Sequence, residues 1–222
     1  MRGIIPPRVF DSVQQHLRSA GESSVSGWED NKEEEDSLTG DLGHHICTRR
    51  HILVNVDGQV WRWRVSYKKF RGRGRGAYES KSGADGIIQV EAALRDETFF
   101  KGVLFQAKKG GEFRTTELTK QVEAIEKIAP GGSAIILYRP TSYVAVKGTE
   151  FLHPGEGLVG PVIKRMRPLG SFFDEFLECK NGLRGMYYEA VRERLVLPTI
   201  DGQIKAVELD VRHRIKIEIA SS

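Results

Sequence analysis

Residues 83–109 read GADGIIQVEAALRDETFFKGVLFQAKK, and the other elements of the chain can be arranged around them. Residues 87–94 and 101–107 are two runs rich in apolar and branched side chains, and 95–98 form a polar break between them. Two such runs joined by a short polar break predict a β-hairpin with its turn at the break. The residues before the first run and those at the end of the second run then meet at the open end of the hairpin.

Three polar side chains at that open end have the chemistry of a metal-dependent site. Strand side chains alternate between faces, so Gln106 and Lys108 share one face, and antiparallel pairing brings Asp85 near both. Mg²⁺ binds carboxylate and amide oxygens and keeps several waters or phosphate oxygens besides. A nearby lysine can position the attacking water and offset the charge that develops at phosphorus. The same pattern also fits the solvent-facing side of a half-buried sheet, and this alternative stays open.

Asp85 followed about twenty residues later by Gln106-x-Lys108, at the end of an apolar strand, resembles the PD-(D/E)xK nuclease superfamily. It looks most like the Mrr-like branch, in which Gln replaces the usual acid, and the resemblance covers roughly residues 30–146. It implies an α/β fold with a restriction-endonuclease-like core, a central mixed β-sheet flanked by helices in the order α-β-β-β-α-β. It also implies Mg²⁺-dependent hydrolysis of phosphodiester bonds in DNA, with Mn²⁺ as a possible substitute, in restriction or anti-phage defence.

Further site residues follow from the resemblance. Similar proteins carry a glutamate that faces the metal from the helix before the sheet, and here Glu35 is the candidate with Glu34 as second choice. A solvated acidic helix face explains the same acids, so this alternative also stays open. Glu79 and Gln121 are supporting candidates, although Glu79 could equally pair with nearby arginines. The implied metal ligands are Asp85, Gln106 and Glu35, and the implied catalytic residues are these three with Lys108.

Hydrophobic spacing predicts the remaining elements. Helices are expected where apolar residues recur every three or four positions, and strands where they alternate or form short continuous runs. Asp57-Gly58 predicts a two-residue hairpin turn, and Thr116 is the expected helix cap. Helices are expected at 8–20, within 28–47, at 115–129, around 172–177 and at 187–195, strands within 51–67, 133–146 and 204–219, and a loop at 148–160.

These elements predict three regions along the chain. Residues 1–27 form an N-terminal lead-in, and 28–147 form the nuclease-like core. Residues 148–222 form a C-terminal extension that completes the core or binds a partner. The order helix, strands, hairpin, helix, buried strand within 28–147 agrees with the α-β-β-β-α-β core that the resemblance implies.

The charge of the chain is mildly basic but unevenly spread. The 222 residues carry a formal net charge of +4, and the pI is near 9.0. Residues 61–75 hold seven basic side chains and no acid. Glycines alternate with arginines through residue 76, which predicts a flexible basic loop from 68 onward, where Phe70 or Tyr78 could stack on a base. The residues expected to contact nucleic-acid phosphates are Lys68, Lys69, Arg71, Arg73 and Arg75.

Composition narrows the class of protein further. Cys47 and Cys179 lie far apart without the spacing of metal ligands, which argues against a disulfide framework or a zinc site. No apolar run approaches the length of a membrane span, and the N-terminus has no signal pattern, so a cytoplasmic protein that does not enter the membrane is expected. The expected partners are DNA and a second copy of the chain or another protein subunit. The rival hypothesis is a non-catalytic nucleic-acid-binding or assembly subunit, and RNA is not excluded as the substrate.

Overall fold

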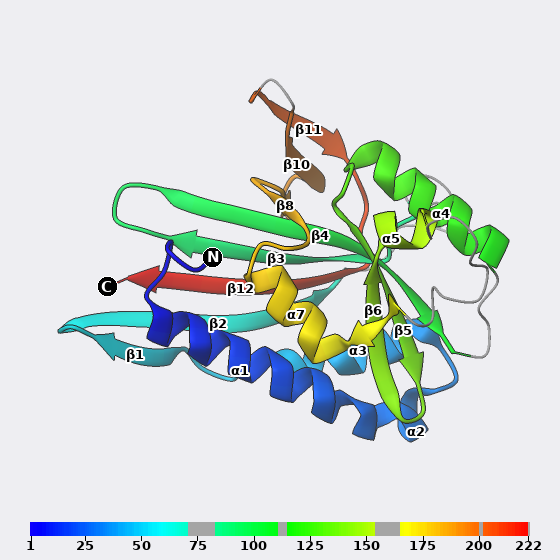
Figure 1. The fold of residues 1–222 in the computed structure, drawn as a ribbon, viewed down its shortest axis with the longest axis horizontal. Helices are drawn as coiled ribbons and strands as arrows, with labels where there is room; N and C mark the ends of the chain where they lie inside the picture. The colour runs from blue at the N-terminus through cyan, green and yellow to red at the C-terminus, as the bar shows by residue number, and fades with distance from the viewer. Residues whose placement is uncertain (71–82, 111–114, 154–164, 200–201, 222) are drawn as a thin grey trace.

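The chain folds around a large mixed β-sheet flanked by helices (Figure 1). The computed structural model describes residues 1–70, 83–110, 115–153, 165–199 and 202–221. Within these ranges, the main sheet has nine strands: β1 (Ile52–Val56), β2 (Gln59–Lys69), β3 (Gly86–Ala93), β4 (Thr98–Lys109), β5 (Ser133–Arg139), β6 (Ser142–Lys147), β7 (Arg167–Pro168), β8 (Leu183–Arg184) and β12 (His213–Ser221). They lie in the order β1-β2-β12-β3-β4-β5-β6-β7, and β8 pairs with β4. The β12–β3 and β4–β5 pairs are parallel and the others antiparallel.

Both faces of the main sheet are covered. The described helices are α1 (Pro7–Ser23), the 3₁₀ turn η1 (Ser24–Gly27), α2 (Trp28–Asn31), α3 (Glu35–Ile46), α4 (Thr115–Ile128), α5 (Gly148–Leu152) and α7 (Leu169–Leu177). The neighbouring residues Ile87 and Ile88 of β3 point to opposite faces and belong to different apolar clusters. The cluster around Ile88 includes side chains of α1, α3 and α7. The cluster around Ile87 includes α4 and a second sheet, formed by β9 (Tyr187–Glu189), β10 (Arg194–Pro198) and β11 (Ile204–Glu208).

The predicted hairpin is confirmed. β3 and β4 pair antiparallel from Gly86 opposite Phe105 to Ala93 opposite Thr98, and the backbone N–H of Leu94 donates to the carbonyl of Glu97 to close the turn. The hairpin of β1 and β2 is confirmed as well. Its turn residues Asp57 and Gly58 have φ values of 51° and 79°, as a two-residue turn of this type requires.

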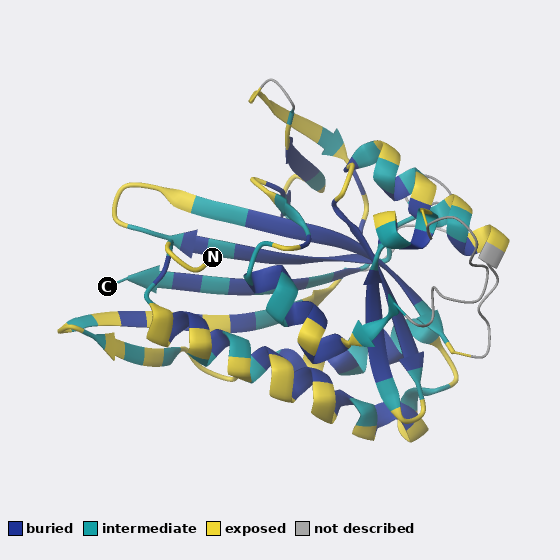
Figure 2. Ribbon diagram, in the orientation of Figure 1, coloured by how far each residue is buried: buried dark blue, intermediate teal, exposed yellow. Residues whose placement is uncertain are grey.

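The helix and strands that follow the hairpin are also confirmed. α4 ends at Ile128, directly before the predicted end at residue 129. Because α4 begins at Thr115, Thr116 lies inside the helix, and its prediction as the cap is wrong. β5 is buried along almost its whole length, as its continuous apolar run predicts (Figure 2).

Three further local predictions are wrong. Residues 187–195 form β9, a turn and the start of β10 instead of a helix, because their backbone pairs within the small sheet. The loop predicted at 148–160 begins with the short helix α5. Lys68 and Lys69 belong to β2 instead of a flexible loop, because β12 supplies pairing partners as far as Lys69. Phe70 packs edge-on against Tyr188 with the two ring centroids 5.7 Å apart, and its stacking on a base stays a prediction.

The last strand lies in the middle of the main sheet. β12 pairs antiparallel with β2 on one side and parallel with β3 on the other. At the other end of the chain, α1 packs against α7, and its residues Val9, Phe10 and Leu17 are almost fully buried. Residues from all three predicted regions therefore share one core, and the main sheet combines strands of the second and third regions.

Candidate active site

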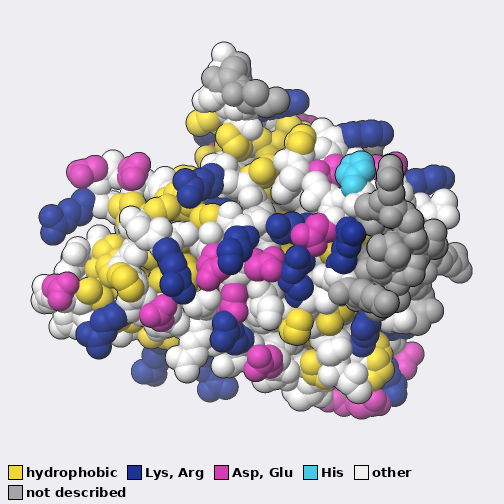
Figure 3. Space-filling view, viewed as in Figure 1, with side chains coloured by type: hydrophobic (Ala, Val, Ile, Leu, Met, Phe, Trp, Pro, Cys, Tyr) yellow, Lys and Arg dark blue, Asp and Glu magenta, His cyan; other side chains and the backbone are white. Residues whose placement is uncertain are grey.

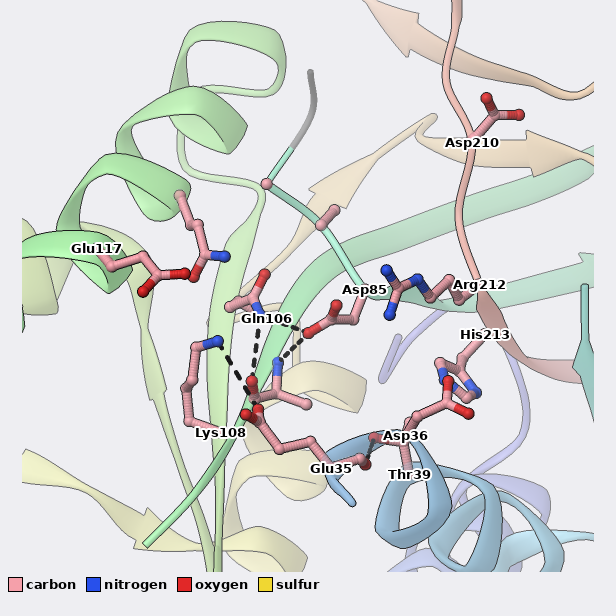
Figure 4. Close-up of a pocket in the computed structure, with 14 residues that line it drawn as sticks. Glu35, Asp36, Thr39, Asp85, Gln106, Lys108, Glu117, Asp210, Arg212 and His213 are labelled. Carbon is pink, nitrogen blue, oxygen red and sulfur yellow. Dashed lines mark hydrogen bonds and ion pairs between the residues drawn. The ribbon is translucent and has the colours of Figure 1, made fainter. Parts of the chain in front are cut away.

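A cavity of about 310 Å³ lies at the open end of the β3–β4 hairpin, between α3 and α4 (Figure 4). Asp85 lies directly before β3, Gln106 and Lys108 lie on β4, and Glu35 is the first residue of α3. The structure therefore brings together the four residues predicted to be catalytic. The lining residues are Glu35, Asp36, Thr39, Gly83, Ala84, Asp85, Gln106, Ala107, Lys108, Glu117, Gln121, Asp210, Arg212 and His213.

Asp85 is held by its backbone and by its side chain. Its N–H donates to the carbonyl of Phe105, and its carbonyl accepts from the N–H groups of Arg212 and His213 at 2.9 and 3.0 Å. Its Oδ2 accepts from the backbone N–H of Ala107 at 2.8 Å and from Nε2 of Gln106 at 2.5 Å. The carboxylate therefore has a fixed position between β4 and β12.

Two glycines flank Asp85 and allow this close packing. A Cβ on Gly86 would lie 2.4 Å from the Phe105 ring and 2.6 Å from the carbonyl oxygen of His213. Gly83 has a φ of +68°, and a Cβ there would lie 2.3 Å from the carbonyl oxygen of Gln121. The motif Gly-Ala-Asp-Gly thus lets the chain pass between α4 and β12 and places Asp85 in the cavity.

Burial raises the pKa of the Asp85 carboxyl to about 6. The Ala107 N–H and the charges of Lys108 and Arg212 oppose this rise in pKa, whereas the neighbouring Asp36 adds to it. An ionised carboxylate is thus held here against a desolvation penalty. A cation bound beside Asp85 would relieve that penalty.

Gln106 presents its amide nitrogen to Asp85, and the same Nε2 donates to the carbonyl of Ala107 at 3.1 Å. The residue is only 3% exposed, so the alternative of an ordinary solvent-facing strand residue is wrong for Gln106. Amide nitrogen is a donor, whereas the amide oxygen can ligate a metal. A metal ion shared by Asp85 and Gln106 therefore requires the Gln106 amide to flip, so that its Oε1 instead of its Nε2 faces Asp85.

Lys108 and Glu35 form a weak ion pair at the edge of the cavity. Lys108 Nζ lies 3.8 Å from Glu35 Oε2, and the two side chains are 15% and 28% exposed. Glu34 precedes α3 as its N-cap residue and does not line the cavity, which favours Glu35 over Glu34. Glu35 stands at the N-terminus of the helix, where the helix dipole favours a carboxylate.

The supporting and nucleic-acid-binding candidates that the structure describes lie in different parts of it. Gln121 lines the cavity from α4, and its buried Oε1 has no hydrogen-bond partner among the described residues. Lys69 bonds to Asp36, while Lys68 lies over the Phe70 ring at 5.1 Å. The predicted candidates Glu79, Arg71, Arg73 and Arg75, and the stacking candidate Tyr78, lie outside the described residues.

Sequence reasoning missed a chain of hydrogen bonds in the cavity wall. Asp36 Oδ1 lies 2.9 Å from His213 Nε2, and His213 Nδ1 lies 2.8 Å from the hydroxyl of Tyr67. Burial lowers the pKa of His213 despite the neighbouring Asp36. Burial acts to raise the pKa of Asp36, but the hydrogen bonds and charges of Lys69 and His213 together lower it. Asp36 was within reach of sequence reasoning, because it follows Glu35 in the acidic run, whereas His213 depends on a distant strand.

The described part of the cavity wall is acidic. Among the described lining residues, the carboxylates are Glu35, Asp36, Asp85, Glu117 and Asp210, and the permanent cations are Lys108 and Arg212. Within the ranges that the structure describes, no three His, Cys, Asp or Glu side chains converge as a ready-made metal cluster. A site with two carboxylates and an amide oxygen, in an acidic wall, matches the way Mg²⁺ binds together with water and phosphate. The residues present therefore fit a hydrated divalent cation better than a fully protein-enclosed one.

Comparisons with protein-family models, curated proteins and solved structures found no significant match to this chain. The resemblance to PD-(D/E)xK nucleases stays a prediction, and any function must be argued from the geometry of the cavity. Among the described residues, no helix combines the length and apolar character needed to cross a membrane.

Proposed function

We propose that this protein is a metal-dependent endonuclease that hydrolyses phosphodiester bonds in DNA. The observation that carries the proposal is the meeting of Asp85, Gln106, Lys108 and Glu35 around one acidic cavity. Three of these residues come from the hairpin and the fourth from a helix whose first turn faces it. The set contains oxygen ligands for a cation and a lysine for the phosphate, which is what such hydrolysis requires.

The order of elements supports a restriction-endonuclease-like core. α3, β2, β3, β4, α4 and β5 follow one another along the chain as α-β-β-β-α-β, with β1 added before β2. The spatial order of the strands differs from their order along the chain, because β12 lies between β2 and β3 in the sheet. The hairpin that carries Asp85 and Gln106 keeps its antiparallel pairing of β3 with β4 beside the inserted strand.

Asp85, Gln106 through its turned amide, and Glu35 would hold Mg²⁺, with Mn²⁺ as a possible substitute. When bound, the ion supplies Lewis-acid stabilisation of the phosphate and an activated water. Asp85 supplies the negative charge that attracts the ion, and its carboxylate position is fixed by the Ala107 N–H. Gln106 carries no charge, so free metal binds more weakly than at a site of two acids and depends more on the substrate phosphate.

Lys108 and Glu35 act on the water and the phosphate. Lys108 Nζ donates to a phosphate oxygen or to the attacking water, and it offsets the negative charge that grows in the transition state. Glu35, 3.8 Å from Lys108, holds the ammonium at the cavity edge and can accept a hydrogen bond from the water. A lysine side chain that is mostly buried has few positions, so its contribution is largely preorganised.

DNA is proposed to approach the side of the molecule that bears the cavity. The face over α1 and α7 shows Lys and Arg mixed with Asp and Glu (Figure 3), and such a mixed surface does not attract a phosphate backbone strongly. Lys68 and Lys69 end the strand that leads toward the cavity wall, where Lys69 bonds to Asp36. A role in restriction or anti-phage defence, with a second copy or another subunit as partner, belongs to this proposal.

A non-catalytic nucleic-acid-binding or assembly subunit is the second candidate. The hydrogen bond from Gln106 Nε2 to Asp85 Oδ2 favours it, because this contact satisfies the carboxylate without any metal. In such a protein the amide would keep its present orientation, and Mg²⁺ would bind no more tightly to the wild type than to a variant without the carboxylate.

Cleavage of supercoiled plasmid and of linear duplex DNA tests the proposal. The wild type is incubated with Mg²⁺ or Mn²⁺ beside Asp85→Ala and Lys108→Ala, with a matched RNA duplex as a second substrate. We expect the wild type to cut DNA and both variants to lose cutting while they keep DNA binding. Metal-independent cutting, or cutting that both variants retain, would refute the proposed site, and preferential cutting of the RNA would change the substrate.

A further inference from the structure

Arg212 joins the candidate active site from the opposite end of the chain. It lies between β11 and β12, and its side chain lines the cavity together with Asp85. Its backbone N–H donates to the carbonyl of Asp85 at 2.9 Å, so the two residues are fixed relative to each other. In Figure 4 the guanidinium is directed toward the Asp85 carboxylate.

Arg212 and Lys108 approach Asp85 from two sides. Figure 4 shows Lys108 beyond Gln106 on one side of the carboxylate and Arg212 on the other. A phosphate bound beside Asp85 would therefore lie between two cations.

We propose that Arg212 binds the phosphate that is cleaved, opposite Lys108. This inference rests on the proposed nuclease function and assigns part of the active site to the C-terminal third of the chain. A guanidinium can donate two parallel hydrogen bonds to two oxygens of one phosphate, whereas an ammonium acts as a point charge. Arg212 would thus orient the phosphodiester, while Lys108 remains available for the water and the developing charge.

A purely structural role for Arg212 makes a different prediction. If Arg212 only holds the cavity wall in its shape, its removal disturbs the site and weakens the binding of every ligand. If Arg212 binds phosphate, its removal weakens the binding of DNA but not that of Mg²⁺. DNA loses a charged hydrogen-bond donor, whereas Mg²⁺ loses a nearby repulsive charge and binds Asp85 at least as tightly.

The test compares Arg212→Gln and Arg212→Lys with the wild type. Calorimetric titration with MgCl₂ alone gives the metal affinity. Anisotropy of a short fluorescent DNA duplex in Ca²⁺, which takes the same oxygen ligands, gives the DNA affinity. We expect Arg212→Gln to weaken DNA binding roughly tenfold and to leave Mg²⁺ affinity equal or higher. Arg212→Lys should keep the wild-type Mg²⁺ affinity and recover part of the DNA affinity, because it keeps the charge but loses the paired donors.

Arg95→Gln is the matched control, because Arg95 is exposed in the β3–β4 turn, roughly 30 Å from Asp85 by strand rise. It should change neither affinity. Unchanged DNA affinity in Arg212→Gln, or a loss of both affinities, would overturn the inference while leaving the nuclease proposal in place. If the wild type binds Mg²⁺ no better than Asp85→Asn does, the nuclease proposal itself fails, and the Arg212 inference fails with it.

Discussion

Replacing Asp85 with asparagine should stabilise the fold at neutral and alkaline pH. The pKa of this carboxyl is about 6 in the folded chain against an ordinary value of 3.8. A difference of about two pKa units corresponds to about 3 kcal/mol. The side-chain oxygen of asparagine can still accept the hydrogen bonds of Ala107 N–H and Gln106 Nε2, so the substitution removes the charge and keeps the local geometry.

The effect must depend on pH in a defined direction. Because the folded pKa is raised, the carboxyl contributes its full stability below pH 3.8, and that contribution is lost as the pH rises through about 6. Asp85→Asn does not titrate at this position. Its gain in unfolding free energy over the wild type should therefore grow from about 0.5 kcal/mol at pH 4 to about 3 kcal/mol at pH 8.

Urea unfolding followed by tryptophan fluorescence, at both pH values and in EDTA, measures this difference. Any pH-independent effect of the substitution cancels between the two pH values. At pH 8, a Mg²⁺ concentration of ten times the dissociation constant should stabilise the wild type by about 1.4 kcal/mol. The same concentration should leave the stability of Asp85→Asn unchanged. A stability difference that is equal at pH 4 and pH 8 would refute the raised pKa, and equal Mg²⁺ stabilisation of both proteins would refute Asp85 as a metal ligand.

Three further predictions concern charged residues. Lys108→Met should lower the rate of cleavage at least 100-fold, as the loss of a general acid–base group does, while Mg²⁺ still stabilises the variant in thermal unfolding. Glu35→Gln should reduce the rate of plasmid cleavage at least tenfold and Glu34→Gln less than twofold, because only Glu35 pairs with Lys108; equal rates for the two variants would contradict this. Burial lowers the pKa of Lys101 to about 8, so its contribution to stability is present above pH 10.5 and lost as the pH falls through 8. In urea unfolding, Lys101→Met should therefore lose up to about 3 kcal/mol of its relative stability between pH 7 and pH 10.5, and a pH-independent difference would refute the lowered pKa.

The parts of the site that could be predicted are local in sequence. Asp85 and Gln106 are joined by a single hairpin, and once the turn is recognised, strand alternation fixes which side chains meet. Glu35 was harder to place, because an acidic run at a helix start has several possible first residues. The observed start of α3 at Glu35 decides between it and Glu34.

The parts that could not be predicted depend on pairing between distant segments. Nothing in residues 204–219 indicates that the last strand inserts between β2 and β3, since an alternating strand pairs equally well at an edge. Residues 187–195 mix apolar and charged side chains in a way that does not by itself distinguish helix from strand, and their pairing within the small sheet decides for strand. His213 and Arg212 could not be recognised as site residues until the position of β12 was known.

The insertion of β12 ties the candidate chemistry to the packing of the whole sheet. The carbonyl of Asp85 accepts hydrogen bonds from Arg212 and His213, and the Asp85 carboxylate is held by the backbone of β4. The same residue therefore joins β4 to β12 and supplies the charge for a cation. His213, through Asp36, also ties β12 to the first turn of α3 beside Glu35. A change that displaces β12 would move Asp85, Asp36 and Arg212 together, so the geometry of this site depends on the last strand as directly as on the hairpin.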